Sequence, residues 1–143
     1  MRIILDTNVL FSALIRDSLT RKIILEFKDK FLFPSYIFEE LEEHKEEIRI
    51  KSKLEDYDFE LVLSRLLERV EIVGSEKLEQ YKEEAVEIAK KIDLDDSLFF
   101  ACALAYPDSI IWSDDRALKR QIKIRIIDTL EMMEILEKFR KDL

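Results

Sequence analysis

The sequence predicts an α/β protein, a three-layer α/β/α sandwich built on a central parallel sheet of about five strands. Short apolar runs of Ile, Val, Leu and Phe alternate along the chain with longer segments in which apolar residues recur at helical spacing. The short runs have no polar face, which is typical of parallel strands that helices cover on both sides. No repeat and no Gly/Ser/Pro-rich linker divides the 143 residues, so a single domain over residues 1–143 is expected.

The first expected strand, Arg2–Leu5, is the apolar run at the start of the chain, and a short helix should follow Asn8. Four further runs share its length and its content of Ile, Val and Phe. These expected strands are Phe31–Phe33, Val70–Val73, Ile110–Ser113 and Ile124–Ile127.

The segments between the strands carry helix-starting residues. One helix is expected over Ser35–Ile48 and another over Ser75–Ile92, with Ser75 as its N-cap. Asp128 and Glu131 have the spacing of a capping box at the start of the last helix, which runs toward Lys138. The remaining expected helices are Asp58–Arg69, Asp96–Ala105 and shorter ones after Asn8, Ser18 and Asp115.

The composition limits the chemistry that is available to the chain. Cys102 is the only cysteine, which excludes an internal disulfide and a cysteine-based zinc site, and its apolar neighbours predict a buried thiol. His44 is the only histidine and lies among Glu and Lys on an expected helix surface, which disfavours Ser-His-Asp and Cys-His catalysis. Abundant Lys and Glu with a single Asn are typical of thermophile proteins.

The formal net charge of −8 counts against nucleic-acid binding, unless divalent cations neutralise an acidic cleft or basic residues gather on one rim. No apolar run has the length of a membrane span, so no association with a membrane is expected. The start of the chain lacks the basic region, long apolar stretch and small-residue cleavage site of a signal peptide. A cytoplasmic location is therefore expected.

Acidic side chains stand where the expected strands end. Carboxyl ends of parallel strands meet at one edge of the sheet, where ligands of such folds bind. Asp6 ends the first strand. Further candidates at the end of the fourth strand and at the starts of two helices are Ser113, Asp114, Asp115, Asp95, Asp96, Glu39 and Glu40. Taken singly, an acid at a helix start is explained by the helix dipole, which contributes about 0.3–1 kcal/mol.

Asp6 is the acid for which a purely structural role is hardest to accept. It stands between the apolar run Ile3–Leu5 and the helical stretch Val9–Leu14, so its carboxylate should be partly desolvated. Carboxylates that converge there would raise one another's pKa values. A divalent metal removes this conflict, and a ligand set made only of oxygen suits Mg²⁺ or Mn²⁺. Asn8, two residues later, is expected to cap the helix, to orient Asp6 or a metal-bound water, or to do both.

Four segments resemble the motifs of PIN domains, and they occur in the order of that family. IILDTNVL resembles the opening strand, in which an Asp precedes Ser/Thr and Asn, and PSYIFEEL resembles the second motif, which implicates Glu40. DDSLFFACALA resembles the third motif and implicates Asp96. IWSDDRAL resembles the fourth, a strand that ends in Ser/Thr-x-Asp, and implicates Ser113 and Asp115. The resemblance covers nearly the whole chain.

The resemblance implies a PIN-like sandwich that cleaves single-stranded RNA with one or two Mg²⁺ or Mn²⁺ ions. The implied catalytic and metal-binding residues are Asp6, Glu40, Asp96 and Asp115, with Asp115 preferred over Asp114 as the direct ligand. A supporting second layer is implied for Thr7, Asn8, Asp93, Ser113 and Asp114. Many small members are VapC-type toxins and commonly dimeric, which implies a possible antitoxin protein as a partner and a homodimer or higher homo-oligomer. The spacing Asp93-x-x-Asp96 and the string Ile-Trp-Ser-x-Asp more closely resemble stand-alone archaeal or bacterial PIN proteins.

In the mechanism that this resemblance implies, one ion would activate a water for in-line attack on the phosphodiester, and a second ion about 4 Å away would stabilise the leaving oxygen. The candidate contacts to the RNA backbone are Arg16, Lys45 and Arg49. For Lys45 and Arg49, a solvated helix face with ion pairs to nearby Glu residues is an equally good interpretation.

Two other functions remain open at the level of sequence. An aspartate-based phosphatase or phosphoryl-transfer domain also places acids at strand ends. Haloacid-dehalogenase-like phosphatases, however, need a second Asp where Asn8 stands, and receiver domains need a strand-end Lys where Asp128 follows. The other alternative is a non-catalytic PIN-like interaction module, although all four candidate acids are present.

Overall fold

The structure of the chain, a computed structural model, describes residues 1–16 and 18–141. Its centre is a five-stranded sheet with the order β3-β2-β1-β4-β5, in which every pairing is parallel. The strands are β1 (Arg2–Leu5), β2 (Phe31–Pro34), β3 (Val70–Val73), β4 (Ser109–Trp112) and β5 (Ile126–Ile127). The predicted parallel sheet of five strands is confirmed.

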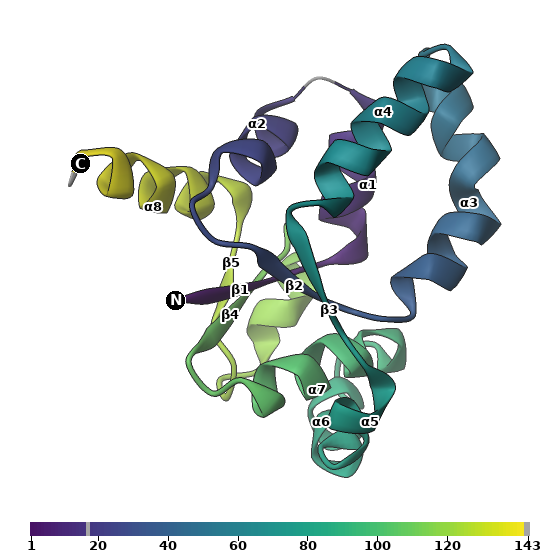
Figure 1. Cartoon of the computed structure of the whole chain (residues 1–143). Helices are drawn as coiled ribbons and strands as arrows, with labels where there is room; N and C mark the ends of the chain where they lie inside the picture. The colour runs from purple at the N-terminus through teal and green to yellow at the C-terminus, as the bar shows by residue number, and fades with distance from the viewer. Residues whose placement is uncertain (17, 142–143) are drawn as a thin grey trace.

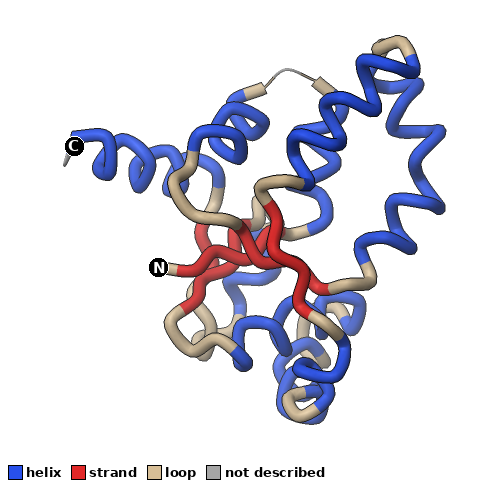
Figure 2. The backbone as a smooth tube through the Cα atoms, in the orientation of Figure 1, coloured by secondary structure: helices blue, strands red, loops and turns tan. Residues whose placement is uncertain are grey.

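Helices cover both faces of the sheet, as Figures 1 and 2 show. One layer holds α1 (Thr7–Ile15), α2 (Leu19–Glu26), α3 (Ile37–Ser52), α4 (Asp56–Leu67) and α8 (Thr129–Lys141). The other layer holds α5 (Ser75–Glu79), α6 (Lys82–Ala89) and α7 (Ser97–Ala105). A short 3-10 helix, η1 (Leu94–Asp96), precedes α7, and a second one, η2 (Arg116–Arg120), follows β4. The three-layer α/β/α sandwich of the PIN-like type is thereby confirmed.

The core lies between the sheet and its two helical layers. An aromatic cluster fills one side of it, with ring centroids 5.3 Å apart between Phe27 and Phe31 and 5.8 Å apart between Phe31 and Trp112. Cys102 on α7 is fully buried, and burial raises the pKa of its thiol to about 12. The predicted structural thiol is confirmed, because a thiol that stays protonated is a poor nucleophile. None of the helices in the described ranges is long and apolar enough to cross a membrane.

The last strand is shorter than the expected run Ile124–Ile127, because a side chain takes the place of a neighbouring strand. The side-chain amide of Gln121 accepts a hydrogen bond from the Ile124 N–H at 2.8 Å and donates one to the Ile124 carbonyl at 2.7 Å. The main-chain groups of Ile124 are thus paired within their own loop, and only Ile126 and Ile127 form the ladder with β4.

The helices also differ from expectation at some of their ends. The helix expected over Ser75–Ile92 is divided into α5 and α6. No glycine or proline marks the break, so the helical spacing of apolar residues could not reveal it. The last helix begins as expected. The N–H of Glu131 donates to the Asp128 carboxylate at 2.9 Å, and the N–H of Asp128 donates to the Glu131 carboxylate at 3.2 Å. These two bonds are a complete capping box.

Arg69, directly after α4, ties down the loop between α2 and β2. Its guanidinium donates hydrogen bonds to the carbonyls of Ile24, Phe27 and Asp29, at 3.4 Å for Ile24 and 3.1 Å for Asp29. We expect Arg69→Ala to lower the free energy of unfolding by about 2–3 kcal/mol, since charge-assisted bonds to partly buried carbonyls are lost. Urea unfolding measures this. Arg65→Ala, at an exposed position of α4, is the control, and an equal loss in both variants would contradict the role of Arg69.

Candidate active site

The end of β1 and the end of β4 lie side by side at the carboxyl edge of the sheet. β1 pairs with β2 on one side and with β4 on the other, so the strand order reverses between β1 and β4. Leu5 is in register with Trp112, and the N–H of Asp6 donates to the Trp112 carbonyl at 3.1 Å. The next residues, Asp6 and Ser113, therefore meet at the topological switch point, where parallel α/β folds bind ligands.

Asp6 is a buried carboxylate, only 7% exposed. The Ser113 hydroxyl donates to its Oδ2 at 2.7 Å, and the backbone N–H groups of Asn8 and Thr7 also favour its charged form. Desolvation outweighs these contacts, and the nearby Asp115 acts in the same direction, so the pKa of Asp6 is raised. The carboxylate is thus fixed in place without a full counter-charge.

A cleft of about 1070 Å³ opens above Asp6 and brings the other predicted acids to it. Glu40 comes from the first turn of α3, Asp96 from the start of α7 and Asp115 from the loop after β4. Burial raises the pKa of Asp96 to about 7, and the charges of Asp6, Asp93, Asp115 and Asp95 add to the effect. The structure therefore brings all four predicted acids to one cleft.

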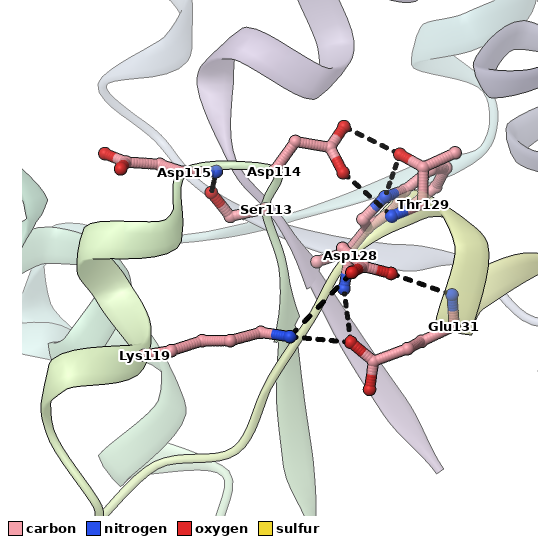
Figure 3. A network of polar contacts seen from close by, with 8 residues as sticks. Ser113, Asp114, Asp115, Lys119, Asp128, Thr129 and Glu131 are labelled. Carbon is pink, nitrogen blue, oxygen red and sulfur yellow. Dashed lines mark hydrogen bonds and ion pairs between the residues drawn. The ribbon is translucent and has the colours of Figure 1, made fainter.

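Asp114 and Asp115 are adjacent in the chain but point in opposite directions (Figure 3). The carboxylate of Asp114 accepts hydrogen bonds from the Thr129 N–H at 2.8 Å and the Thr129 hydroxyl at 2.7 Å, so it holds the start of α8. Asp115 lines the cleft, with its N–H on the Ser113 hydroxyl at 3.1 Å. Ser113 thus joins Asp6 to the backbone of Asp115, and only the second of the two adjacent acids lines the cleft.

The remaining residues predicted for the second layer also lie at this cleft. Asn8 is exposed on the first turn of α1, and Asp93 accepts a hydrogen bond from the Asp95 N–H at 3.0 Å at the start of η1. The Thr7 hydroxyl is 2.8 Å from the Tyr36 hydroxyl. Tyr36 was not predicted. Burial and nearby acids raise its pKa to about 12, so it stays a neutral hydrogen-bonding group in the cleft wall.

His44 also lies in the cleft, although the sequence predicted only a solvent-exposed position on a helix surface for it. It lies one turn after Glu40 on α3, with its Nε2 3.7 Å from the Glu40 carboxylate. In the described part of the chain, ligand atoms from three residues come within 4.8 Å of one another only at Glu40, Glu43 and His44. The spacing of Glu40 and His44, four residues apart on one helix, is the signal that could have placed both at one site.

The three basic residues predicted to contact RNA are not together. Arg16, after α1, lines the cleft. Lys45 and Arg49 lie on another face of α3, where Lys45 pairs with Glu60 at 2.7 Å and Arg49 with Asp56 at 3.2 Å. The cation of α3 that does line the cleft is Lys51, which was not predicted.

Comparison with protein families agrees with this architecture. A family model described as a PIN domain matches residues 4–135, from β1 into α8. No curated protein gives a significant match to the chain. PIN domains are generally nucleases that act on phosphodiester bonds, and they typically use divalent metal ions. The match spans most of the sequence, and the chain belongs to the PIN-domain family.

Proposed function

We propose that the protein is a metal-dependent endoribonuclease that cleaves single-stranded RNA, with Asp6, Glu40, Asp96 and Asp115 as the metal ligands. The observation that carries the proposal is the crowding of like charge at the switch point. The pKa of Asp96 rises to about 7 because burial and four neighbouring carboxylates disfavour its charge. Such a cluster is costly in a protein without a cation, and a divalent ion would return the acids to their ionised form.

The donor set fits Mg²⁺ or Mn²⁺. All four proposed ligands are carboxylates, which these hard cations prefer. No three of the four have carboxylate oxygens within 4.8 Å of one another, so a Mg²⁺ ion bound here would keep several of its waters. One or two ions would fit into a cleft of about 1070 Å³.

Each part of the site has a separate role in the proposed cleavage. When bound, the ions would supply an activated water for in-line attack on phosphorus and charge stabilisation for the leaving oxygen. Asp6 provides the fixed point, because Ser113 holds one of its oxygens at 2.7 Å. Thr7 and Tyr36 join the start of α1 to the start of α3, the helix that brings Glu40 to the cleft. Asp96 and Asp115 complete the acidic wall.

A biological role as the toxin of a toxin–antitoxin pair belongs to the same proposal. It is supported by the resemblance of the four motifs to PIN domains, because many small members of that family are VapC-type toxins. The partners would be an antitoxin protein and a second copy of the chain in a homodimer or higher oligomer. Light scattering of the purified protein, alone and with the product of a neighbouring small reading frame, tests both.

A cleavage assay tests the proposed activity. The purified chain is incubated with labelled single-stranded RNA in Mn²⁺, Mg²⁺, Ca²⁺ or EDTA, and in parallel with a generic phosphomonoester. Cleavage of the RNA in Mn²⁺ or Mg²⁺ that EDTA stops is the expected result. Phosphate release from the phosphomonoester without RNA cleavage would instead support an aspartate-based phosphatase. Binding of Mn²⁺ without any cleavage would indicate an interaction module.

Replacement of Ser113 tests how Asp6 is held. Ser113→Ala removes the only side-chain hydroxyl that is hydrogen-bonded to Asp6 among the described residues, and the Asp115 N–H loses its acceptor at the same time. We expect affinity for Mn²⁺, measured by isothermal titration, to fall about 10–100-fold, as for other groups that orient metal ligands. Ser113→Thr keeps the hydroxyl and should retain most of the affinity for Mn²⁺. Unchanged affinity in Ser113→Ala would show that Asp6 needs no such support.

A further inference from the structure

One face of α3 forms a wall of the cleft along most of the helix. The residues of α3 from its first turn to its last turn that line the cleft are Glu40, His44, Glu47, Ile48 and Lys51. Residues three or four positions apart lie on the same side of a helix, and this set follows that spacing. The step of eleven residues from Glu40 to Lys51 spans about 16 Å at the rise of an α-helix. The cleft is therefore an elongated groove that leads away from the sheet.

The basic side chains of this groove lie apart from its acidic cluster, although one carboxylate, that of Glu47, stands beside Lys51. Four carboxylates, those of Asp6, Glu40, Asp96 and Asp115, lie at the sheet end. Of the described residues that line the groove, Lys and Arg side chains come only from Lys51 and Arg16. Lys51 is eleven residues beyond Glu40, and Arg16 follows the C-terminus of α1, which begins beside Asp6. Both cations thus belong to the end of the groove away from the acids, because both helices start at the sheet edge (Figure 1).

Between the two ends the groove has an apolar stretch, beside which Ser12, His44 and Glu47 also line it. Phe11 and Ile15, four residues apart on α1, face the groove together with Ile48 of α3. The Phe11 ring meets the His44 ring edge-on at a centroid distance of 6.0 Å. Aromatic and apolar side chains of this kind accept unpaired bases by stacking, while cations hold the phosphates of the strand.

We infer that Arg16 and Lys51 form an anchoring subsite for a backbone phosphate of the RNA on one side of the scissile bond, with the intervening bases packed on the apolar stretch. The inference rests on the proposed nuclease function and identifies how that site would hold its substrate. At the 3.4 Å spacing of stacked nucleotides along one strand, about 16 Å corresponds to about four or five nucleotides. Because both cations lie at one end of the groove, they would contact phosphates on only one side of the scissile bond.

The ion pair within this subsite is weak enough to give way to a phosphate. Lys51 is 2.9 Å from the Glu47 carboxylate, and both side chains are more than half exposed. Ion pairs between exposed side chains contribute little to stability, so exchanging Glu47 for a phosphate costs little. Glu47 nevertheless competes with the RNA for Lys51. Removing its charge should strengthen binding.

The first test measures dependence on substrate length. RNAs with one fixed cleavage site are extended by one to six nucleotides on the 5′ or the 3′ side, and kcat and KM are measured for each. We expect KM to fall as one flank grows to about four or five nucleotides and to stay level as the other flank grows. A KM that falls equally with both flanks, or with neither, would overturn the inference.

The second test uses a matched pair of double variants on the same helical layer. Arg16→Ala/Lys51→Ala removes the two cations of the groove, whereas Lys45→Ala/Arg49→Ala removes the same charge from another face of α3. The groove variant should raise KM about tenfold, leave kcat nearly unchanged and abolish the dependence on flank length. The slope of log affinity against log salt concentration should become shallower by about 1.4. This is the value expected for the loss of two phosphate contacts to a single strand. Equal losses in both double variants would overturn the inference.

A binding measurement separates this inference from the cleavage activity itself. Fluorescence anisotropy of a labelled ten-nucleotide RNA in Ca²⁺ gives Kd without requiring turnover. We expect Kd to rise about tenfold for Arg16→Ala/Lys51→Ala, to stay level for Lys45→Ala/Arg49→Ala and to fall a few-fold for Glu47→Gln. If the protein binds RNA in this pattern but cleaves none, the proposed activity fails and the subsite stands. Binding that is insensitive to Arg16 and Lys51 refutes the subsite whatever the cleavage result.

Discussion

Asp6→Asn is expected to lower RNA cleavage in Mn²⁺ by about a thousandfold or more while the fold is retained. The change removes the charge of the most deeply buried of the four acids and keeps its shape, and a metal contribution of about 4 kcal/mol to the transition state corresponds to that factor. The metal-free variant should be at least as stable as the parent, because a desolvated carboxylate is replaced by a neutral amide. Single-turnover kinetics and thermal unfolding measure the two effects.

Asp114→Asn is the matched control, because it makes the same chemical change at the end of the neighbouring strand, in a side chain that points away from the cleft. Asp114 holds Thr129 at the start of α8 and does not line the cleft. Its replacement should cost about 1 kcal/mol of stability, as for other helix caps, and change kcat less than a few-fold. Equal loss of activity in Asp6→Asn and Asp114→Asn would contradict the assignment of the metal ligands.

The sheet and its acidic edge could be predicted from the sequence because they depend on short-range patterns. A run such as Ile3–Leu5, apolar on both faces and followed at once by Asp6, specifies both a buried parallel strand and the polar residue at its end. Glu131 at capping-box spacing from Asp128 likewise indicated the start of α8. Where local signals agree with the global fold, prediction from one sequence succeeds.

The orientation of individual side chains depends on contacts between residues far apart in the chain, which no local pattern reveals. Asp114 is turned out of the cleft by Thr129, fifteen residues away (Figure 3). Tyr36 joins the site through Thr7, twenty-nine residues before it. On α3 the sequence could not tell which basic residues face the cleft, because that depends on which side of the helix packs on α1.

The charged residues of α3 are a second case in which the sequence alone does not show which side chains reach the cleft. Lys45 and Arg49 stand four residues apart and therefore share a face, but that face meets Glu60 and Asp56 of α4. Lys51 lies on the face of Glu40 and His44. Charged residues surround this helix on several sides, so its few apolar residues form too narrow a stripe to show its orientation from the sequence. Only the packed structure separates the two sets of cations.

The metal-free protein is expected to lose stability as pH rises from about 5 to 8, which is opposite to the behaviour of an ordinary salt-bridged carboxylate. The pKa of Asp96 is raised to about 7 in the folded chain, first by burial and then by Asp6 and its other acidic neighbours. In the unfolded chain the group titrates near its ordinary value of 3.8. Between these two values the folded state holds the extra proton, so stability falls as pH rises toward 7 and levels off above it.

Asp96 is partly exposed, so solvent screening reduces the effect to about 1–2 kcal/mol between pH 5 and pH 8. The raised pKa of the more deeply buried Asp6 acts in the same direction. Thermal unfolding in EDTA across this range measures the change, which corresponds to a few degrees in Tm. Asp96→Asn should flatten the profile and stabilise the metal-free protein at pH 8, and His44→Gln serves as the control for the single histidine.

Mn²⁺ should reverse this dependence, because ion binding requires the acids to be deprotonated and stabilises only the folded chain. At pH 5 protons compete with the ion for the same carboxylates, so its effect on Tm should be small. At pH 8 the ion neutralises the charges that destabilise the metal-free protein, so the increase in Tm should be largest there. A Tm that rises equally with Mn²⁺ at both pH values, or that rises as much in Asp96→Asn, would place the bound ion away from these acids.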